Sequence, residues 1–376
     1  MKKLRLMTIV GTRPEIIKLS AIMKQCDRYF DHVLVHTGQN YDYQLNEVFF
    51  KDLGLRAPDH FLGVAGQDAG ETMGNVIAKS YQCLVDVRPD AVLVLGDTNS
   101  CLAVLSAKRL KIPIFHLEAG NRCKDENLPE EVIRRIVDVT SDINLCYSEH
   151  ARRYILESGV KPEHTFVVGS PMREVLSGCA ANIAASTVLE DVGLEPGRFI
   201  VVSAHREENI DIEANFRSLM ASIGRLADEF AMPVVYSCHP RSAKMIAQRD
   251  VRFPERVIVR PPFGFFDYNR LQSSAFCVVS DSGTLPEESA CLGFPAVAIR
   301  TSTERPEAME QGVFIVGAID PESVIQSVRL AVDLHRDGRH ASAVPAYEDG
   351  NVSTKVVKLV QSYTGVVNQM VWRKPR

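Results

Sequence analysis

The stretch VVSDSGTLPEE at residues 278–288 decides the fold of this chain. Here an apolar run ends in small polar residues and passes into a predicted helix, and VLGDTNS at residues 94–100 repeats the arrangement in the first half. This pattern predicts a buried parallel strand that delivers a loop at its carboxyl end, where open α/β sheets bind ligands. Two such strands predict two sheets, and we expect the function to lie in a cleft between the two domains.

Length, charge and cysteine usage narrow the class of protein. A chain of 376 residues is longer than one hydrophobic core usually serves, which predicts two domains. The net charge of -4 argues against a general nucleic-acid partner. No segment approaches the roughly 18 apolar residues of a membrane span, so we expect no membrane partner either. The nine cysteines are scattered singly, as in a reduced cytoplasmic protein, and the amino-terminal residues resemble a first strand rather than a signal peptide.

Strands alternate with helices along both halves, which predicts two Rossmann-like, doubly wound α/β domains. We expect a first domain at residues 1–172, a second at 173–360 and a C-terminal helix at 361–376 that packs back on the first. Small residues at 177–187 form the predicted linker. The predicted strands cover residues 4–10, 32–37, 90–95, 112–117, 143–147, 165–168, 199–203, 234–238, 257–259, 276–280 and 296–299.

Polar residues follow the predicted strands of the first domain. In GTRPE at residues 11–15, which opens a helix, Arg13 can bind an anion or remain solvated. Asp97 and Glu118 end two strands, and Glu130 begins a helix. These carboxylates can transfer protons, hold a metal or be solvated loop acids. Because no metal-ligand spacing accompanies them, we expect neither a metal nor a cofactor.

Two histidines hold corresponding positions in the second domain. His205 follows one predicted strand and precedes Arg206, and His239 follows the next. Each can contact phosphate or move a proton, and a structural role is the alternative. His116, inside an apolar strand, is expected to pack in a core instead. Arg305 lies in a charged segment that can add positive charge for an anion or form a salt-bridged loop.

The loop at residues 280–284 (SDSGT) carries the strongest local signal for a ligand. Glycine allows close approach of the backbone, and the following helix N-terminus offers free N–H groups to a diphosphate. Glu288, just inside that helix, can accept hydrogen bonds from ribose hydroxyls. A capping box of Thr284 with Glu287 is the alternative interpretation, and both can hold together.

Taken in order along nearly the whole chain, these motifs resemble the non-hydrolysing UDP-N-acetylglucosamine 2-epimerase family. The motifs that carry the resemblance are GTRPE at 11–15 with Lys18, GDT at 96–98, HLEAG at 116–120, PEE at 129–131, HR at 205–206, DSG at 281–283 with EE at 287–288, and TERPE at 303–307. The resemblance implies the glycosyltransferase-B fold of two Rossmann-like domains, with UDP held mainly by the second, and a homodimer.

The resemblance also implies a reaction, the inversion of C2 in a UDP-linked 2-acetamido sugar. UDP is eliminated across C1–C2 to give a 2-acetamidoglycal and is then added back, with the proton on the other face. This chemistry needs carboxylates near C2 and positive charge near the diphosphate. The implied catalytic residues are Asp97, Glu118, Glu130 and His205. The implied contacts to UDP are Arg13, Ser282, Gly283 and Glu288, and the further substrate-binding candidates are Lys18, Arg134, Arg206, His239, Thr284 and Arg305.

The chain departs from the common family pattern at two places. Ile133 stands where the family usually has Asn before Arg134. The loop NRCKDENL at residues 121–128 resembles the branch that converts UDP-2-acetamido-2,6-dideoxy-L-talose to UDP-N-acetyl-L-fucosamine for capsule or O-antigen synthesis, and we expect that substrate. UDP-GlcNAc is the alternative substrate. A glycosyltransferase of the same fold is the rival from another reaction class, and the three carboxylates argue against it.

Overall fold

The computed structural model describes residues 3–39, 49–123, 128–300, 302–339 and 343–375. The chain divides into two compact units, the first formed by Met1–Gly178 with Pro345–Arg376 and the second by Cys179–Val344. The return to the first unit at Pro345 comes earlier than the limit of 361 drawn from the sequence. It begins earlier because Tyr347 is buried and the amide of Ser170 donates to the carbonyl of Ala346 at 2.7 Å.

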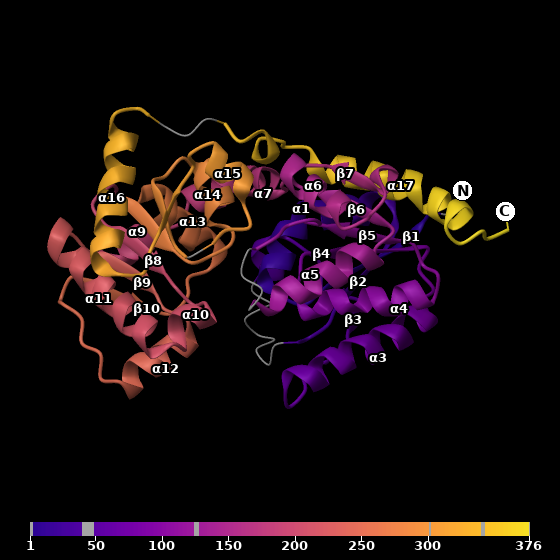
Figure 1. Ribbon diagram of the computed structural model, residues 1–376, viewed down its shortest axis with the longest axis horizontal. Coiled ribbons are helices and arrows are strands. Elements are labelled where there is room, and N and C mark those ends of the chain that lie inside the picture. Colours follow the sequence, from indigo (N-terminus) through magenta and orange to yellow (C-terminus); the bar gives the residue numbers. More distant parts are fainter. Residues whose placement is uncertain (1–2, 40–48, 124–127, 301, 340–342, 376) are drawn as a thin grey trace. The chain divides into compact units, whose positions relative to one another are not determined.

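A seven-stranded sheet organises the first unit, in the order β3-β2-β1-β4-β5-β6-β7 with every neighbouring pair parallel (Figure 1). Its strands are β1 (Arg5–Val10), β2 (Asp31–His36), β3 (His60–Phe61), β4 (Ala91–Leu95), β5 (Ile114–Leu117), β6 (Ile143–Cys146) and β7 (Thr165–Val167). Its helices are α1 (Arg13–Tyr29), α3 (Ala69–Val87), η1 (Asn99–Leu102), α4 (Ala103–Arg109), α5 (Pro129–Thr140), α6 (Glu149–Glu157), η2 (Pro162–His164), α7 (Met172–Gly178), η3 (Pro345–Tyr347) and α17 (Val352–Met370).

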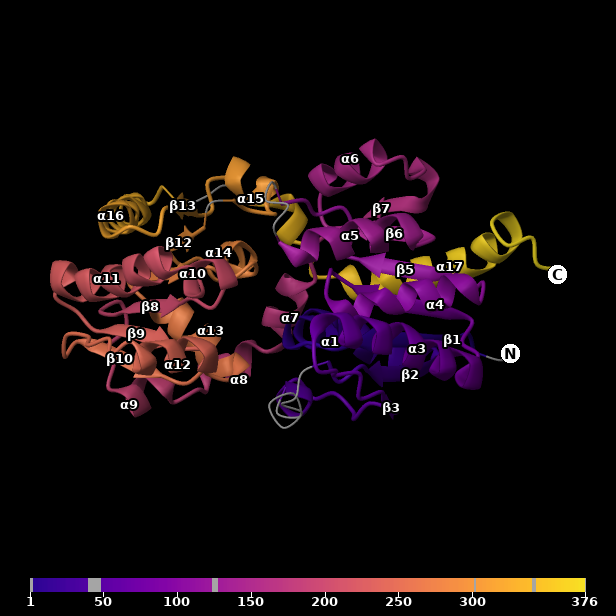
Figure 2. The same ribbon diagram turned by 60° about the horizontal axis from the view of Figure 1, so that its bottom comes forward.

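Helices cover the first sheet because its strands are apolar on both faces. All five residues of β4 are buried, as expected for a strand inside a parallel sheet. Met7 and Ile9 of β1 pack in one core cluster with buried residues of α3, α4 and α5. Helices α7 and α17 pack against α1 (Figure 2). The C-terminal helix therefore belongs to the first unit.

The second unit repeats this plan with six parallel strands in the order β10-β9-β8-β11-β12-β13. Its strands are β8 (Ile200–Ser203), β9 (Val234–Ser237), β10 (Val257–Arg260), β11 (Cys277–Ser280), β12 (Ala296–Ile299) and β13 (Ile315–Gly317). Its helices are α8 (Ala180–Ala184), α9 (Val188–Val192), α10 (Glu207–Ile210), α11 (Glu213–Phe230), α12 (Pro240–Gln248), α13 (Phe265–Ser274), α14 (Leu285–Leu292), α15 (Pro306–Glu310) and α16 (Pro321–Arg336).

The predicted class of two doubly wound α/β units is confirmed. Two short strands and one helix differ from what the sequence pattern predicted. The eleven strands predicted from apolar runs are all present within a residue or two. The short strands β3 and β13, of two and three residues, were not predicted. The predicted linker at 177–187 contains the helix α8, since alanine favours helix.

Both sheets reverse their strand order at one point, which is where ligands bind in open α/β sheets. In the first unit the reversal lies between β1 and β4, and in the second between β8 and β11. The loops that follow these four strands begin at Gly11, Gly96, Ala204 and Asp281, in the motifs singled out from the sequence. The topology therefore places each group of motifs at the expected edge of its own sheet.

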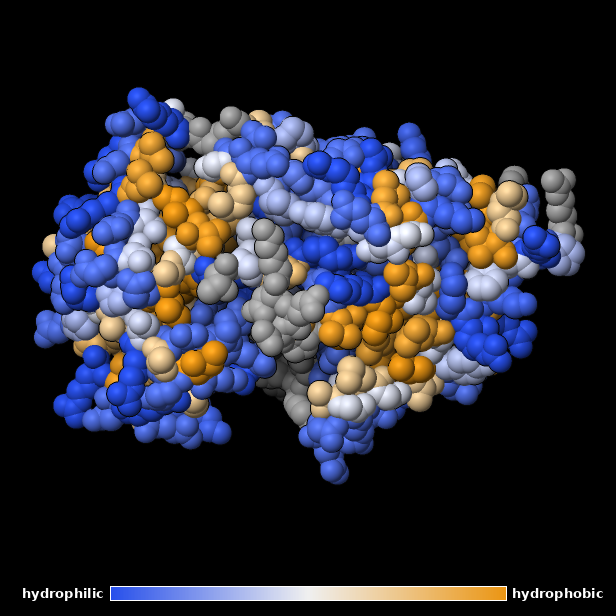
Figure 3. Space-filling view, viewed as in Figure 1, coloured by the Kyte–Doolittle hydropathy of each residue, from blue (hydrophilic) through white to orange (hydrophobic). Residues whose placement is uncertain are grey.

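An exposed apolar face lies over α3, α4 and α5 of the first unit (Figure 3). Its members are the exposed large side chains of three neighbouring helices: Tyr81, Val85, Leu105, Val132 and Val139. No helix of the described residues is both long enough and apolar enough to cross a membrane.

Candidate active site

The loop after β1 is held by a buried carboxylate that begins α1. The Oε2 atom of Glu15 accepts hydrogen bonds from the amides of Gly11 (2.8 Å) and Thr12 (2.7 Å), and Oε1 accepts from the hydroxyl of Thr98 (2.8 Å). Burial raises the pKa of Glu15 to about 7, although these hydrogen bonds oppose the shift. Glycine is needed at position 11, because a Cβ there would lie 1.9 Å from the Oγ of Ser100. Glu15 thereby joins the loops after β1 and β4.

Arg13 has no counter-charge among the residues that the structure describes. Its side chain is partly buried, and its guanidinium carbon lies 5.6 Å from the centre of the Phe49 ring. Burial lowers the pKa of Arg13. Among the residues that the structure describes, none forms an ion pair with it. A partly desolvated, unpaired guanidinium is suited to bind an anion.

The carboxylate that follows β4 is paired with an arginine of α5. Arg134 donates from Nε to Oδ2 of Asp97 at 3.1 Å, and a second guanidinium nitrogen contacts the same oxygen. Arg134 also donates from Nη1 to Oε2 of the buried Glu131 at 2.8 Å. The same Glu131 oxygen accepts from the amide of Cys123 at 3.1 Å. Glu131, which was not selected as a site residue from the sequence, therefore holds Arg134 in place.

The carboxylate that follows β5 is surrounded by donors. Lys18 of α1 lies 2.7 Å from Oε2 of Glu118, the hydroxyl of Tyr147 lies 3.3 Å from the same oxygen, and Nδ2 of Asn121 lies 3.1 Å from Oε1. Glu118 has a φ of +66°, a left-handed conformation that non-glycine residues seldom adopt and that clusters at functional sites. Lys18, predicted to bind substrate, is engaged with Glu118 in this structure.

The structure places two of the three predicted carboxylates on neighbouring strands. Because Leu95 of β4 pairs with Leu117 of β5, Asp97 and Glu118 extend from adjacent strand ends. Glu130 is exposed in the first turn of α5 and belongs to neither of their contact networks. The first unit thus offers two carboxylates that are each held against a cation.

In the second unit a buried aspartate organises the loop after β8. Oδ2 of Asp281 accepts from the amides of His205 and Arg206, both at 2.9 Å, and from Nδ2 of Asn209 at 3.0 Å. Its Oδ1 lies 3.2 Å from Nδ1 of His205. Burial alone would raise the pKa of Asp281, but His205, the Arg206 amide and Asn209 together hold it below its usual value. The His205 side chain remains 47% exposed and can meet a ligand.

The other basic candidates lie around this loop. Arg206 donates from Nε to the carbonyl of Asp281 at 2.9 Å. The rings of His205 and His239 have their centres 6.1 Å apart. His239 precedes α12, and its Nδ1 accepts from the amide of Arg241 at 3.3 Å. His205, Arg206 and His239 therefore form one basic group at the switch point of the second sheet.

The loop after β11 leads into α14, but not through the predicted capping box. The Thr284 hydroxyl donates to Oε1 of Glu288 at 2.8 Å, and Gln272 donates to Oε2 at 2.7 Å. Glu287 lies instead 3.2 Å from a guanidinium nitrogen of Arg305, and both side chains are buried. The prediction of the box was wrong because a buried arginine needs a charged partner, and Glu287 supplies it. Ser282 and Gly283 remain partly exposed in front of the helix.

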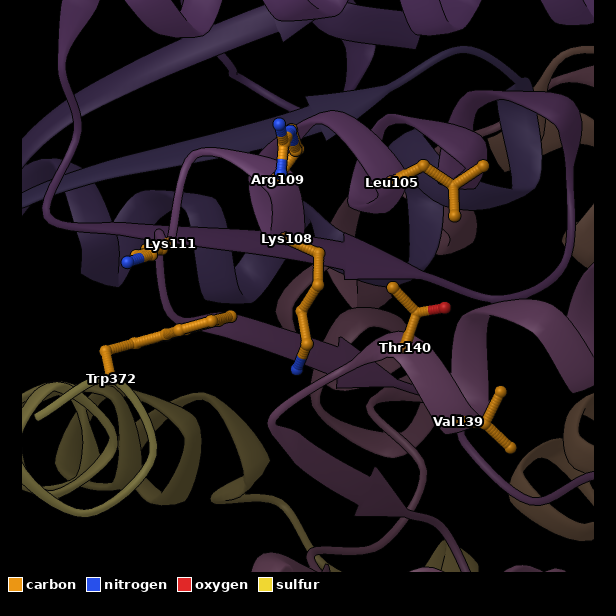
Figure 4. Close-up of a pocket in the computed structure, with 7 residues that line it drawn as sticks. All are labelled: Leu105, Lys108, Arg109, Lys111, Val139, Thr140 and Trp372. Atoms are coloured by element: carbon orange, nitrogen blue, oxygen red, sulfur yellow. The ribbon is translucent and has the colours of Figure 1, made fainter.

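A surface pocket of the first unit contains none of the predicted site residues (Figure 4). It is lined by Leu105, Lys108, Arg109, Lys111, Val139, Thr140 and Trp372. Lys108 lies 5.1 Å from the Trp372 ring centre and bonds Asp142 at 2.6 Å. The helix α4 ends at this pocket just before β5 begins, so it lies at the amino edge of the sheet, away from the strand ends that carry Asp97 and Glu118.

Comparisons with known proteins agree with this architecture. A family model described as UDP-N-acetylglucosamine 2-epimerase matches residues 24–361. The structure of UDP-N-acetylglucosamine 2-epimerase from Rickettsia bellii is 42% identical, covers 99% of this chain and 100% of its own, and superposes with a TM-score of 0.92. UDP-GlcNAc 2-epimerase from Methanocaldococcus jannaschii, in complex with UDP-GlcNAc and UDP, is 27% identical over 95% of this chain and 99% of its own, with a TM-score of 0.88. UDP-2,3-diacetamido-2,3-dideoxy-D-glucuronate 2-epimerase from Pseudomonas aeruginosa is 30% identical over 94% of this chain and 99% of its own.

Proposed function

Because this chain belongs to the UDP-N-acetylglucosamine 2-epimerase family of isomerases, we propose that it inverts C2 of a UDP-linked 2-acetamido sugar by eliminating UDP and adding it back. The observation that carries this proposal is the pair Asp97 and Glu118, two carboxylates that extend from adjacent strands, each bonded to a cation. Such groups are suited to remove a proton and to return one.

Elimination explains why proton removal at C2 is feasible. The C2 proton is not next to a carbonyl group, so its removal leaves an electron pair that has no neighbouring acceptor. In the proposed step a carboxylate takes the proton, the C2–H electrons form the C1=C2 bond, and the C1–O bond breaks with its electrons on UDP. Re-addition reverses these changes and delivers a proton to the opposite face. Lys18 and Arg134 would hold Glu118 and Asp97 in a fixed orientation, and Glu130 is the third candidate for proton transfer.

The second unit is proposed to bind the UDP part. A leaving diphosphate needs positive charge and hydrogen-bond donors: Arg206 would supply the charge, and the neighbouring His205 and His239 rings would donate hydrogen bonds. Ser282, Gly283 and Thr284 would add hydrogen bonds in front of α14. Glu288 would accept from the ribose in place of the Thr284 hydroxyl. Arg13 would contact the phosphates from the first unit, and Arg305 would act by holding Glu287 in α14.

We propose UDP-2-acetamido-2,6-dideoxy-L-talose as the substrate and UDP-N-acetyl-L-fucosamine as the product, for capsule or O-antigen synthesis. The support is the composition of the loop at 121–128, of which residues 124–127 lie outside the described part of the chain. UDP-GlcNAc is the alternative, favoured by the names of the Rickettsia bellii and Methanocaldococcus jannaschii proteins. A cytoplasmic location is proposed from the nine free cysteines, a pattern typical of reducing compartments.

The test of this proposal is epimerisation of each sugar by the purified protein in D2O, followed at H2 by proton NMR. Deuterium at C2 with appearance of the epimer is the expected result, and the faster sugar identifies the substrate. A glycosyltransferase would leave C2 protonated in both sugars and would release UDP only when an acceptor is added. That outcome would replace the epimerase assignment.

We also propose that the protein is a homodimer that buries the exposed face of α3, α4 and α5. Val132 and Val139 are each 58% exposed on one side of α5, and Tyr81, Val85 and Leu105 continue the apolar surface. Large contiguous apolar patches usually mark interaction sites. Sedimentation equilibrium should give a dimer for the wild type and a monomer for Val132→Glu. A monomeric wild type, or a dimer unaffected by the charge, would contradict the proposal.

A further inference from the structure

A buried histidine lies directly beneath the two proposed catalytic carboxylates. His116 of β5 is fully buried, two residues before Glu118. Its Nε2 lies 2.8 Å from the carbonyl oxygen of Gly96, the residue before Asp97. A carbonyl oxygen only accepts hydrogen bonds, so Nε2 carries a proton and donates it. The imidazole thus ties the strand end that carries Glu118 to the loop that carries Asp97.

The other side of the imidazole faces a buried aspartate. Oδ1 of Asp138, on α5, lies 3.0 Å from Nδ1 of His116 and accepts from the amide of Gly120 at 3.2 Å. Its Oδ2 accepts from Nη1 of Arg122 at 2.6 Å. Burial would raise the pKa of Asp138, but His116 and Arg122 hold it below its usual value. His116 and Asp138 thus form a buried pair, with no exposed surface on either side chain.

The pair joins three segments that carry proposed catalytic groups. Gly96 precedes Asp97, Gly120 follows Glu118 by two residues, and Asp138 lies one turn along α5 from Arg134, the partner of Asp97. The backbone has little freedom here, because a Cβ at Gly120 would lie 2.1 Å from the carbonyl oxygen of Ala151. A change in the pair would therefore shift the two carboxylates relative to each other, because it contacts the segment of each one separately.

We propose that His116 and Asp138 are positioning residues that set the separation of Asp97 and Glu118 through the Gly96 carbonyl and the Gly120 amide. The inference rests on the proposed roles of Asp97 and Glu118. It adds that β5 and α5 contribute a fully buried pair whose role is geometric. Neither His116 nor Asp138 needs to touch the sugar for this role.

Asp142 offers a matched control for Asp138. It is equally buried, and its Oδ2 accepts from the amide of Ile114 at 3.0 Å while Oδ1 accepts from Lys108 at 2.6 Å. Both aspartates therefore accept from a backbone amide at an end of β5 and from one lysine or arginine side chain, and Asp138 also lies beside His116. They differ in which end they hold, since Ile114 begins the strand and Gly120 follows its carboxyl end.

The test compares Asp138→Asn with Asp142→Asn by steady-state kinetics and by calorimetry with UDP, well below the unfolding temperature. We expect Asp138→Asn to lower kcat by about a hundredfold, because small misplacements of catalytic groups have effects of that size. KM and the affinity for UDP should change by less than about threefold. Asp142→Asn should leave kcat nearly unchanged. Equal effects of the two variants would overturn the inference.

Two further measurements keep the inference testable if Asp138→Asn folds poorly. In the double variant His116→Gln/Asp138→Asn, the loss in kcat should be no larger than in the worse single variant, because the two residues act as a unit; additive losses would contradict this. Nitrogen-15 NMR of histidine-labelled wild-type protein should show one imidazole whose Nε2 carries a proton that exchanges slowly with water, because that proton is donated to the buried Gly96 carbonyl. Absence of such a ring would also overturn the inference.

The proposed function can fail separately from this inference. If Asp97→Asn and Glu118→Gln both retain near-normal deuterium incorporation at C2, the proposed proton-transfer roles are wrong. If those variants are inactive while Asp138→Asn behaves like Asp142→Asn, only the positioning role is wrong.

Discussion

The two units share one strand order, yet they place opposite chemistry at the point where that order reverses. The first unit presents two carboxylates, Asp97 and Glu118, that are each bonded to a cation. In the second unit the corresponding carboxylate, Asp281, is buried, and a basic group led by His205 and Arg206 is presented instead. The topology provides a place for function at each edge, and the side chains at the strand ends decide which function it is.

A second difference concerns how many of the polar groups at each edge already have hydrogen-bond partners within the protein. In the first unit, both carboxylates already have their hydrogen-bond donors, so their orientation is set in advance. In the second unit, His205 is half exposed, and Ser282 and Gly283 lie partly open before α14. The first edge is therefore suited to precise proton transfer and the second to binding an anion. The following changes, ordered by the size of the expected effect, test this difference between the two edges.

The largest expected effect is on turnover from the first unit. Glu118→Gln or Asp97→Asn should lower kcat by about two to four decades, since each removes a carboxylate that we propose for proton transfer. Affinity for UDP, measured by calorimetry, should be largely kept. Near-normal turnover in both variants would contradict the claim that the edge of the first unit is the one that transfers protons.

A smaller effect, on UDP affinity rather than on turnover, is expected from a change in the second unit. Ser282→Ala should weaken UDP binding by about tenfold or more, because a hydrogen bond to a charged group contributes roughly 1.5–3 kcal/mol. Ser273→Ala is the matched control, since among the described residues its hydroxyl donates only to the Arg270 carbonyl, on the exposed side of α13. Calorimetry should separate the two variants, and equal UDP affinities would argue against this binding loop.

The buried Glu15, which lies in the first unit, should make the stability of the protein depend on pH. Its pKa is about 7 in the folded protein, above the unfolded value, so the folded state binds the proton more tightly. This contribution to stability is fully present below the unfolded pKa and is lost as pH rises through about 7. Relative to wild type, Glu15→Gln should therefore gain stability between pH 5 and pH 8, by a few kcal/mol. Denaturant unfolding at the two pH values measures this, and a constant difference between the proteins would contradict it.

The smallest effect is expected from ion pairs outside both edges. Arg225 and Glu322 lie 3.2 Å apart on the exposed surface of the second unit. Arg225→Ala should change neither kcat nor UDP affinity, and it should leave the melting temperature almost unchanged, because exposed pairs contribute little. A clear loss of activity would show that ion pairing in general, rather than position at the switch point, explains the effects above.

Local pattern was sufficient for the strands and for the residues at their ends. Apolar runs such as AVLVL of β4 predicted buried parallel strands, and the polar residues after them lie at the sheet edges. Pattern could not show which carboxylates are buried and what they bond. Glu287 matched a capping box in sequence, but its partner is Arg305 from another element.

The same limit applies to the residues that hold the first edge together. His116 was predicted to pack in a core, and it is buried, but its polar partners come from Gly96 and Asp138 on two other segments. In the motif at residues 11–15 the sequence indicated a role for Arg13 but none for Glu15. The hydrogen bond from Thr98 to Glu15 nevertheless joins two loops that are distant in the sequence. These contacts depend on tertiary packing, so no spacing along the chain could predict them.

The most direct test of the central claim follows the C1–O bond itself. The UDP sugar that reacts is labelled with oxygen-18 in the bridge between C1 and the β-phosphorus, and the label is followed by phosphorus-31 NMR during epimerisation. The account predicts that the label moves into the non-bridging positions of the β-phosphate as the epimer forms, because UDP leaves and returns. Epimerisation with the label still in the bridge would show that the bond never breaks, and it would contradict the elimination mechanism.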